Sequence, residues 1–424
     1  MTGGDSNNKA FRLCCTVQNY EWGRHGGAGE VGRLYSLMSK SPPEEDKPYA
    51  ELWMGTHDSG HSLVVVEEEH TEKLALRNWL QEHPEALGDK VLSVGKALSI
   101  QAHPDKDLAQ VLHQAQPKVY KDSNHKPEMA LALTEFEALC GFVSAQELKI
   151  VLQTVPEIEN ILGESRTIEL MNIEPRDQSD DHVKMSLKSA FTQLMTIDKE
   201  AVMEAVMKLK VRLNQENQVR NLTVKEQLVL RLEKQYPNDI GVISAFFFNY
   251  VKLAPGEALY LDANEPHAYL YGECVECMAT SDNVVRAGLT PKYRDVETLC
   301  SMLTYKQGLP EILQGVPLNP FTTRYAPPFY EFEVDRCILP LSATVTFPAV
   351  SGPSIFLILY GQGVVTQKLI NDESKINVQE GDVFFIPADI HLDISSIIEE
   401  NIEANKEHRP LHLYRAGVNS RVFE

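Results

Sequence analysis

The chain has 424 residues, which is long enough for two or three domains with a sizeable core. Hydrophobic residues make up 43% of it and charged residues 24%, a composition that is ordinary for a soluble globular protein. The formal net charge of -20 argues against nucleic acid or an anionic membrane surface as a partner.

The seven cysteines follow no regular spacing that would indicate a disulfide framework. Cys274 and Cys277 form a C-x-x-C pair, but no second pair follows at zinc-ribbon spacing, so we predict reduced thiols. The sequence has no basic-then-apolar signal, and no apolar run reaches membrane-spanning length. We therefore expect a cytoplasmic protein.

Strands dominate the first part of the chain. Phe11 to Val17, Ala50 to Gly55 and Lys96 to Ile100 each have a strand-like pattern. The third of these strands runs directly into Gln101 and His103. Residues two apart on a strand point to the same face, so these two side chains can aim at one point.

A helical pattern replaces the strands after Gly141. Ser144 to Glu147 and Thr223 to Glu226 have the spacing of a capping box, which marks the start of a helix. Apolar residues then recur at intervals of three and four, as over Lys199 to Leu213. We predict a helical segment over 144–240, interrupted by a charged loop over 164–180. It contains few candidate active-site residues, which favours a structural or lid role.

Strands return near Val242, and a long polar segment follows. A strand ending at Leu261 leads into a break from Asp262 to Pro266, and His267 comes directly after the proline. A set of acidic, amide and basic side chains lies downstream: Glu276, Asp282, Asn283, Arg286 and Lys292. This combination suits a site for an anionic small molecule.

The polar segments together supply the donor atoms of a metal site. Gln101, His103 and His267 offer one amide and two imidazoles, and the segment from Asn124 to Glu128 adds a carboxylate. Histidine nitrogen and carboxylate oxygen suit zinc, and a site that is not filled by four cysteines usually leaves room for water or substrate. The alternative is a set of unrelated polar turns, and spacing alone does not decide between the two.

Five segments resemble type I phosphomannose isomerases (mannose-6-phosphate isomerases): VQNYEWG, AELWMGTH, SIQAHPDK, NHKPEMALAL and LDANEPHAYLYGECVECMATSDNVVRAGLTPK. They occur in the family's order, and the resemblance covers nearly the whole chain. It implies a zinc-dependent aldose–ketose isomerase, with one Zn²⁺ per chain, that interconverts mannose 6-phosphate and fructose 6-phosphate. Such an enzyme feeds mannose into GDP-mannose synthesis and glycosylation or into glycolysis.

The same resemblance assigns roles to individual residues. Gln101, His103, Glu128 and His267 match the metal ligands, and Arg286 matches the catalytic arginine.

A repeat within the chain agrees with the cupin-type fold that the resemblance implies. Pro255 to His267 and Gln379 to His391 both contain a glycine, an acid, four largely apolar residues, a break and a histidine. This pattern resembles the second cupin motif. His391 has no Gln-x-His partner before it, so we predict that it is not a metal ligand.

The predicted fold is therefore mainly β with an α-helical insertion. We expect two cupin-like (jelly-roll) β-barrel domains plus a helical domain. Residues 1–143 with 241–316 form the catalytic domain, 144–240 the helical insertion, and 317–424 a non-catalytic C-terminal domain.

The implied reaction adds further candidates. Moving a carbonyl between C1 and C2 of a sugar requires removal of a proton beside the carbonyl and stabilisation of an enediolate. Arg286 can stabilise that charge or bind the phosphate. The candidates for proton transfer are Glu276, Lys126 and His125, and the sequence does not choose among them. The candidates for substrate binding are Ser99, Lys292, Tyr269 and Asp282.

The sequence leaves two alternative functions. One is a different cupin metalloenzyme, such as an iron dioxygenase or another sugar-phosphate isomerase, and the other is a sugar-sensing binding protein. Gln101 counts against the dioxygenase, which favours all-histidine or two-histidine-one-carboxylate sites. The presence of both Arg286 and Lys292 counts against the binding protein. We expect a monomer that acts on a small phosphorylated sugar.

Overall fold

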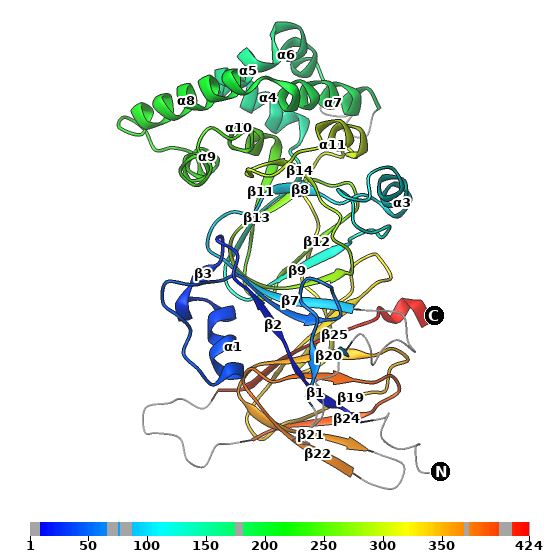
Figure 1. Ribbon diagram of the computed structural model, residues 1–424. Helices are drawn as coiled ribbons and strands as arrows, with labels where there is room; N and C mark the ends of the chain where they lie inside the picture. The colour runs from blue at the N-terminus through cyan, green and yellow to red at the C-terminus, as the bar shows by residue number, and fades with distance from the viewer. Residues whose placement is uncertain are drawn as a thin grey trace.

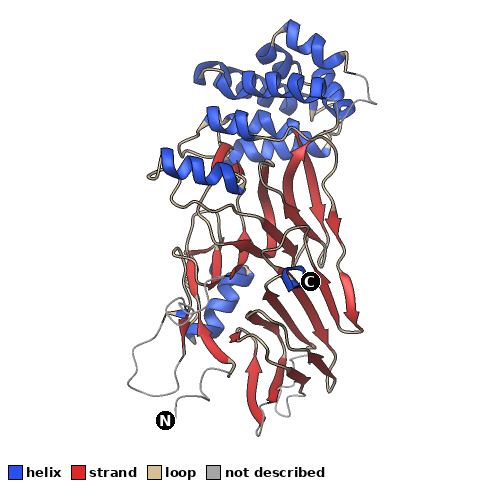
Figure 2. Cartoon of the chain, turned by 90° about the vertical axis from the view of Figure 1, so that its right-hand side faces the viewer, coloured by secondary structure: helices blue, strands red, loops and turns tan. Residues whose placement is uncertain are grey.

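The computed structural model describes residues 9–65, 75–76, 87–173, 181–368, 373–397 and 409–423. Most of the helices gather at one end of an elongated molecule, and sheets with a few further helices beside them fill the rest (Figures 1 and 2). This agrees with the predicted mainly β chain that carries a helical insertion. None of the helices in the described residues is long and apolar enough to cross a membrane.

The largest sheet, which has 11 strands, carries most of the predicted site residues. Its strands are β2 (Thr16–Gln18), β5 (Glu51–Gly55), β7 (Leu87–Val94), β8 (Ile100–Ala102), β9 (Glu128–Ala132), β10 (Phe136–Phe142), β11 (Phe248–Leu253), β12 (Ala258–Leu261), β13 (His267–Ala279), β14 (Val285–Gly288) and β15 (Ile312–Leu313). The main path runs in the order β15-β12-β9-β13-β7-β5-β2, and the long β13 also pairs with β8 and β10. The segments around His103, Glu128 and His267 are therefore neighbours in one sheet.

The C-terminal part contributes most of two further sheets. The 8-stranded sheet contains β1 (Phe11–Cys14), β6 (Leu63–Val64), β16 (Val316–Asn319), β17 (Thr322–Tyr325), β18 (Glu333–Leu339), β20 (Ser354–Tyr360), β23 (Val383–Ile386) and β25 (Leu411–Gly417). The 4-stranded sheet contains β19 (Thr344–Phe347), β21 (Gln362–Lys368), β22 (Glu373–Gln379) and β24 (Leu392–Ser396). A short pair, β3 (Arg24–His25) with β4 (Pro48–Tyr49), stands apart.

Strand β1 connects the two ends of the chain. Phe11 lies opposite Phe385 in the antiparallel pair of β1 and β23. The predicted domain division grouped this strand with the catalytic residues 1–143, whereas its pairing places it in the sheet of the C-terminal region. The pairings recorded for the described residues form open sheets, so the two jelly-roll barrels stay a prediction.

The two larger sheets share one apolar core. Leu52, Val91 and Val275 of the 11-stranded sheet belong to the same buried cluster as Leu357 and Tyr414 of the 8-stranded sheet. Burial of apolar surface is the main favourable term in folding, so this cluster joins the two regions firmly. A second apolar cluster fills the space between the 8-stranded and 4-stranded sheets.

The predicted helical segment is helical in the structure. It contains α4 (Ala145–Thr154), α5 (Pro156–Leu162), α6 (Glu164–Met171), α7 (Asp181–Thr196), α8 (Lys199–Glu216), α9 (Val224–Gln235) and α10 (Ile240–Ser244). The other helices and turns are η1 (Gly26–Ala28), α1 (Glu30–Ser39), α3 (Lys106–Ala115), η3 (Ala245–Phe247), α11 (Val296–Met302) and η4 (Ser420–Phe423).

The helix starts follow the predicted signals. Thr223 and Glu226 form a reciprocal capping box at the start of α9. Ser144 Oγ accepts a hydrogen bond of 3.2 Å from the backbone N–H of Glu147. The predicted loop over 164–180 is wrong in its first half, because residues 164–171 form α6 and bury Leu170. Residues 174–180 lie outside the described part of the chain.

One carboxylate ties the helical segment to the strand β14. Asp239 Oδ1 accepts hydrogen bonds from the backbone N–H of Gly241 at 2.7 Å and of Leu289 at 2.6 Å. Its Oδ2 accepts a third from the N–H of Thr290 at 3.2 Å. The backbones approach closely here, since a Cβ added to Gly241 would lie 2.5 Å from the Leu289 nitrogen. The helical segment therefore fixes the end of β14.

We predict that Asp239→Ala lowers the melting temperature. The change removes three hydrogen bonds and leaves two part-buried N–H groups of the β14 end without an acceptor, which costs about 1–3 kcal/mol for each unsatisfied group. Asp198→Ala is the matched control, because Asp198 caps α8 through a single exposed bond to Ala201. A melting temperature that falls no further in Asp239→Ala than in this control would contradict the link.

Candidate metal centre

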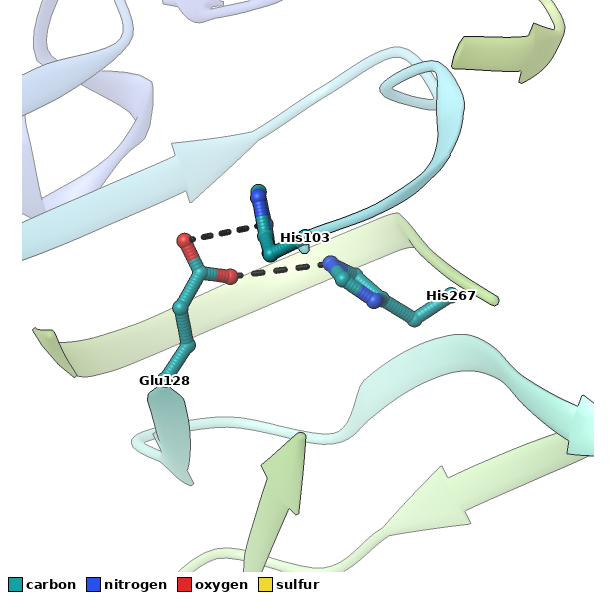
Figure 3. A group of neighbouring side chains, drawn as sticks. All are labelled: His103, Glu128 and His267. Carbon is teal, nitrogen blue, oxygen red and sulfur yellow. Dashed lines mark ion pairs between the residues drawn. The ribbon is translucent and has the colours of Figure 1, made fainter. Parts of the chain in front are cut away.

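Two imidazoles and one carboxylate meet in the 11-stranded sheet. His103 follows β8, Glu128 begins β9, and His267 begins β13. His103 Nε2 lies 3.4 Å from Glu128 Oε1, and His267 Nε2 lies 3.6 Å from Glu128 Oε2 (Figure 3). One ligand atom from each residue lies within 4.8 Å of the others. Nitrogen and oxygen donors at this spacing could hold a divalent metal ion.

The local backbone explains why these side chains converge. His267 pairs with Gln101 across β13 and β8, and Leu261 pairs with Glu128 across β12 and β9. The turn between Leu261 and His267 contains Asn264 in the left-handed region, with φ of 62°. The backbone N–H of Asn264 donates a 2.7 Å hydrogen bond to the carbonyl of His103. The turn before His267 is thus tied to the segment that carries His103.

Three buried atoms of this group have no hydrogen-bond partner in the structure: His103 Nε2, His267 Nε2 and Glu128 Oε2. The other ring nitrogens are engaged, because His103 Nδ1 lies 2.6 Å from the carbonyl of Asn283 and His267 Nδ1 lies 3.1 Å from that of Glu265. A carbonyl only accepts, so each Nδ1 donates and each Nε2 of the neutral ring presents a lone pair.

The protonation states also suit a metal. Burial lowers the pKa of His103 to about 4, so its ring is neutral near pH 7. Burial alone would raise the pKa of Glu128, but the charge of Lys126 and the neighbouring imidazoles hold it well below its usual range. Buried lone pairs without partners are costly. These residues therefore fit a metal ion.

Gln101 lies beside this group. Its Cα is paired with those of His267 and Arg286 on the two neighbouring strands. Its side-chain Oε1 accepts a hydrogen bond of 3.1 Å from Ser99 Oγ. The structure thus places Gln101 and Ser99 at the predicted site, and the role of Gln101 as a ligand stays a prediction.

Two predicted cations lie close to the group. Lys126 is buried, and its Nζ lies 2.7 Å from Glu128 Oε1. Arg286 is partly buried on β14, opposite Gln101. Burial lowers the pKa of Arg286, and no carboxylate of the described chain acts against this. A partly desolvated guanidinium without a counter-charge is suited to bind an anion.

A second buried charged cluster extends the site along β13. Glu276 Oε2 lies 2.5 Å from Lys90 Nζ, which in turn lies 3.6 Å from Glu51 Oε1. Lys90 Nζ also lies over the ring of Trp53, 4.8 Å from its centroid. Burial lowers the pKa of Lys90. The charges of Glu51 and Glu128 raise this pKa, and the charge of Lys126 lowers it. The two clusters therefore interact electrostatically.

The sequence analysis missed Lys90 and Glu51 as functional candidates. The available signals were Glu51 at the start of the otherwise apolar β5 and the adjacent charged residues Asp89 and Lys90 in β7. A lysine or glutamate is almost never fully buried unless it is paired. The partner of Lys90, however, is Glu276 on β13, and no local pattern reveals this pairing.

The remaining candidates are spread around the group. Tyr269 is buried, its hydroxyl has no hydrogen-bond partner in the structure, and its ring centroid lies 6.3 Å from that of His267. Asp282 lies 3.7 Å from His57 Nε2 and 3.7 Å from Lys121 Nζ. Lys292 is exposed in the loop after β14.

His125 and His391 lie away from the group. His125 Nε2 lies 2.6 Å from Glu331 Oε1 of the C-terminal region. His391 is partly exposed and lies 3.6 Å from Asp393. Within the part of the chain that the structure describes, His103, Glu128 and His267 form the single cluster that could hold a metal.

Comparisons with known proteins point to one family. The model of the type I phosphomannose isomerase catalytic domain matches residues 10–145, and that of the helical insertion domain matches residues 161–248. Mannose-6-phosphate isomerase 1 of Arabidopsis thaliana is 53% identical over 97% of this chain and 94% of its own length. Mannose-6-phosphate isomerase of Homo sapiens is 40% identical over 90% of this chain and 94% of its own length.

Solved structures agree. A zinc-bound mannose 6-phosphate isomerase superimposes with a TM-score of 0.77 at 26% identity, covering 97% of this chain and 99% of that chain. A variant of phosphomannose isomerase from Salmonella typhimurium superimposes with a TM-score of 0.78 at 26% identity, with the same coverage. These structures cover 97% of this chain, so the helical segment and the C-terminal sheets have their counterparts in them.

We predict that His267→Ala removes bound divalent metal while the protein stays folded. The change deletes one of two imidazole donors and leaves one histidine, one carboxylate and the predicted amide ligand Gln101, which is a much weaker donor set for zinc. Metal content by mass spectrometry and a thermal melt measure the result. His391→Ala is the control and should keep the full metal content. Stoichiometric metal in folded His267→Ala, or a large loss in His391→Ala, would contradict the assignment.

Proposed function

The chain belongs to the type I phosphomannose isomerase family, and from this we propose that it interconverts mannose 6-phosphate and fructose 6-phosphate. We assign it one Zn²⁺, held by Gln101, His103, Glu128 and His267. The observation that carries this proposal is the buried His–Glu–His group with its unpartnered donor atoms. Arg286 lies opposite Gln101 on the neighbouring strand and adds a cation for a charged substrate.

The chemistry requires charge to be stabilised beside a sugar carbon. Zinc, when bound, supplies a positive charge that polarises the carbonyl. Arg286 provides a planar set of donors for the cis-enediol(ate) or for the phosphate. Its guanidinium has no carboxylate partner in the described chain, so it reaches the substrate without first breaking an ion pair.

Lys126 and Glu276 are the residues we assign to proton transfer between C1 and C2. Both are buried in the interior of the 11-stranded sheet, and each is paired with an opposite charge, Lys126 with Glu128 and Glu276 with Lys90. His125 is less suitable because its Nε2 is already engaged by Glu331 at 2.6 Å. A group that transfers a proton must reach the carbon directly or through one water.

We assign substrate binding to Ser99, Lys292, Tyr269 and Asp282. The exposed Lys292 suits the phosphate, since a chain with a net charge of -20 needs local cations for an anionic ligand, and the neutral Ser99 offers a hydroxyl for a hydrogen bond. The free hydroxyl of Tyr269 and the partly exposed carboxylate of Asp282 suit sugar hydroxyls.

We further propose the cupin-like fold for both β regions, divided as predicted into 1–143 with 241–316, 144–240 and 317–424. The backbone supports the sequence repeat. Gly256 and Gly381 have φ of 91° and 86°, and eight residues later Asn264 and Asp389 have φ of 62° and 61°. Matching left-handed residues at matching positions favour a shared motif over a chance resemblance.

The cellular setting is also a proposal. None of the seven cysteines forms a disulfide in the structure, which suits a reducing compartment such as the cytoplasm. There a monomeric isomerase would feed mannose into GDP-mannose synthesis and glycosylation or into glycolysis.

A coupled assay for fructose 6-phosphate formation from mannose 6-phosphate tests the function. We expect turnover that a chelator abolishes and added Zn²⁺ restores. Folded, zinc-loaded protein without turnover would contradict the isomerase. Sugar binding without turnover would instead favour a binding protein, and oxygen consumption would favour a dioxygenase.

We predict that Arg286→Ala lowers turnover by roughly a hundred- to thousandfold, the usual loss for one donor to developing charge. Arg286→Lys should recover only part of the rate, because lysine keeps the charge but loses the planar fork. Turnover, Michaelis constant and zinc content are measured for both. Arg294→Ala is the control, since Arg294 donates to the carbonyl of Ala287 and serves the backbone. If Arg286→Ala keeps most of its turnover at saturating substrate, the catalytic assignment is wrong.

A further inference from the structure

Glu331 of the C-terminal region reaches the segment that carries Lys126 and Glu128. It lies in the connection between β17 and β18, and its Oε1 lies 2.6 Å from His125 Nε2. We propose that Glu331 is a positioning residue for the isomerase reaction, which holds His125 and thereby the segment 124–128 in place. This inference rests on the proposed function. It also gives the C-terminal region, which we expected to be non-catalytic, an indirect part in the reaction, because Glu331 acts through His125.

Neighbouring side chains of this segment have different partners. Lys126 Nζ contacts Glu128 inside the sheet at 2.7 Å, whereas His125 contacts Glu331. The backbone is held from the β13 side, because Asn283 Nδ2 donates to the carbonyl of Asn124 at 2.9 Å. Among the described residues, Glu331 is the side chain of the C-terminal region that contacts His125. Without it, Lys126 would be fixed from one side only.

The loop that carries Glu331 is held by hydrogen bonds and by apolar packing. Asn419 Nδ2 donates to the carbonyls of Phe329 at 2.8 Å and of Phe332 at 3.3 Å, on either side of Glu331. Phe332 is fully buried in the core between the two larger sheets. The ring of Phe329 meets that of Tyr260 at 6.4 Å. Because Tyr260 pairs with Met129, the residue after Glu128, the same loop also packs against the strands of the metal group.

The groups around Glu331 favour its ionised form, which can accept a hydrogen bond from His125. The bond to His125 lowers the pKa of Glu331, and the positive charge of Lys106 acts in the same direction. The carboxylate is therefore ionised, and a His125 ring with hydrogen on Nε2 donates to it. The second oxygen, Oε2, is a buried atom without a hydrogen-bond partner in the structure. Loss of this carboxylate frees the imidazole without removing any group from the site itself.

The test compares zinc-loaded Glu331→Ala, Glu331→Gln and His125→Ala with the parent. A displacement of about 1 Å at a reacting group can cost up to a hundredfold in rate, so we expect Glu331→Ala to lower kcat about tenfold. KM, zinc content and melting temperature should stay near the parent's. Glu331→Gln should recover part of kcat, because its amide oxygen still accepts. Since both single changes break the same contact, the double variant should be no slower than the slower single one.

The control is Tyr330→Ala, which alters the neighbouring residue of the same loop; Tyr330 is 63% exposed. It should keep the parental kcat. Hydrogen exchange provides a readout that does not depend on activity: Glu331→Ala should speed exchange of the backbone amides over 121–128 relative to the parent and to the control.

Several outcomes would overturn the proposal. They are a parental kcat in Glu331→Ala, unchanged exchange over 121–128, and losses that multiply in the double variant. A joint fall of melting temperature and zinc content without rescue by Glu331→Gln would indicate a structural role and would overturn it as well. If the zinc-loaded parent itself does not turn over mannose 6-phosphate, the proposed function fails, and the exchange experiment still decides whether Glu331 holds the segment.

Discussion

The carboxylate of Glu128 is shared by two imidazoles and a lysine at a position closed to water. A buried charge is tolerated only when opposite charges or a metal compensate it, so this arrangement constrains everything around it. Lys126 contacts Glu128 with the opposite charge. On the neighbouring strands, Lys90 of β7 and Glu276 of β13 form a second pair of opposite charges. The 11-stranded sheet can contain this polar group because apolar clusters on its other sides provide the stability.

The site is held from both ends of the molecule. At the helical end, Asp239 fixes the residues that follow β14, the strand of Arg286. At the other end, the core shared by the two larger sheets fixes β9 and β13. The N-terminal strand β1 pairs with β23, so the C-terminal sheets cannot separate from the site without breaking a strand pair. Regions that carry no predicted metal ligand thus contribute to the site by fixing the positions of the strands that do.

Local rules predicted much of this arrangement. The capping box at Thr223 and the helical periodicity around it led to helices where they were expected. The turn before His267 delivered its ring beside that of His103, and the backbone of Gln101 lies opposite His267. These features depend on a few adjacent residues, so a pattern in the sequence is enough to find them.

The rest depends on partners far apart in the chain. The charged stretch at residues 164–171 read as a loop, yet it forms α6 because Leu170 is buried against the other helices. The pairing of Lys90 with Glu276 requires the register of β7 with β13, and β1 pairs with β23 of the C-terminal region, where Phe11 lies opposite Phe385. Sequence separation of this size carries no local signal.

The repeated motif shows what a backbone alone can and cannot provide. The same glycine turn and the same left-handed residue precede His267 and His391. His267 starts a strand whose neighbour offers Gln101, and it enters a buried group of polar donors. Leu392, next to His391, pairs instead with Phe347 and Gln367, and the surrounding interior is filled by apolar side chains. His391 stays at the surface beside Asp393. A histidine after this turn becomes a candidate ligand only where adjacent strands bring further donors, so the neighbouring strands determine which of the two repeats carries a site.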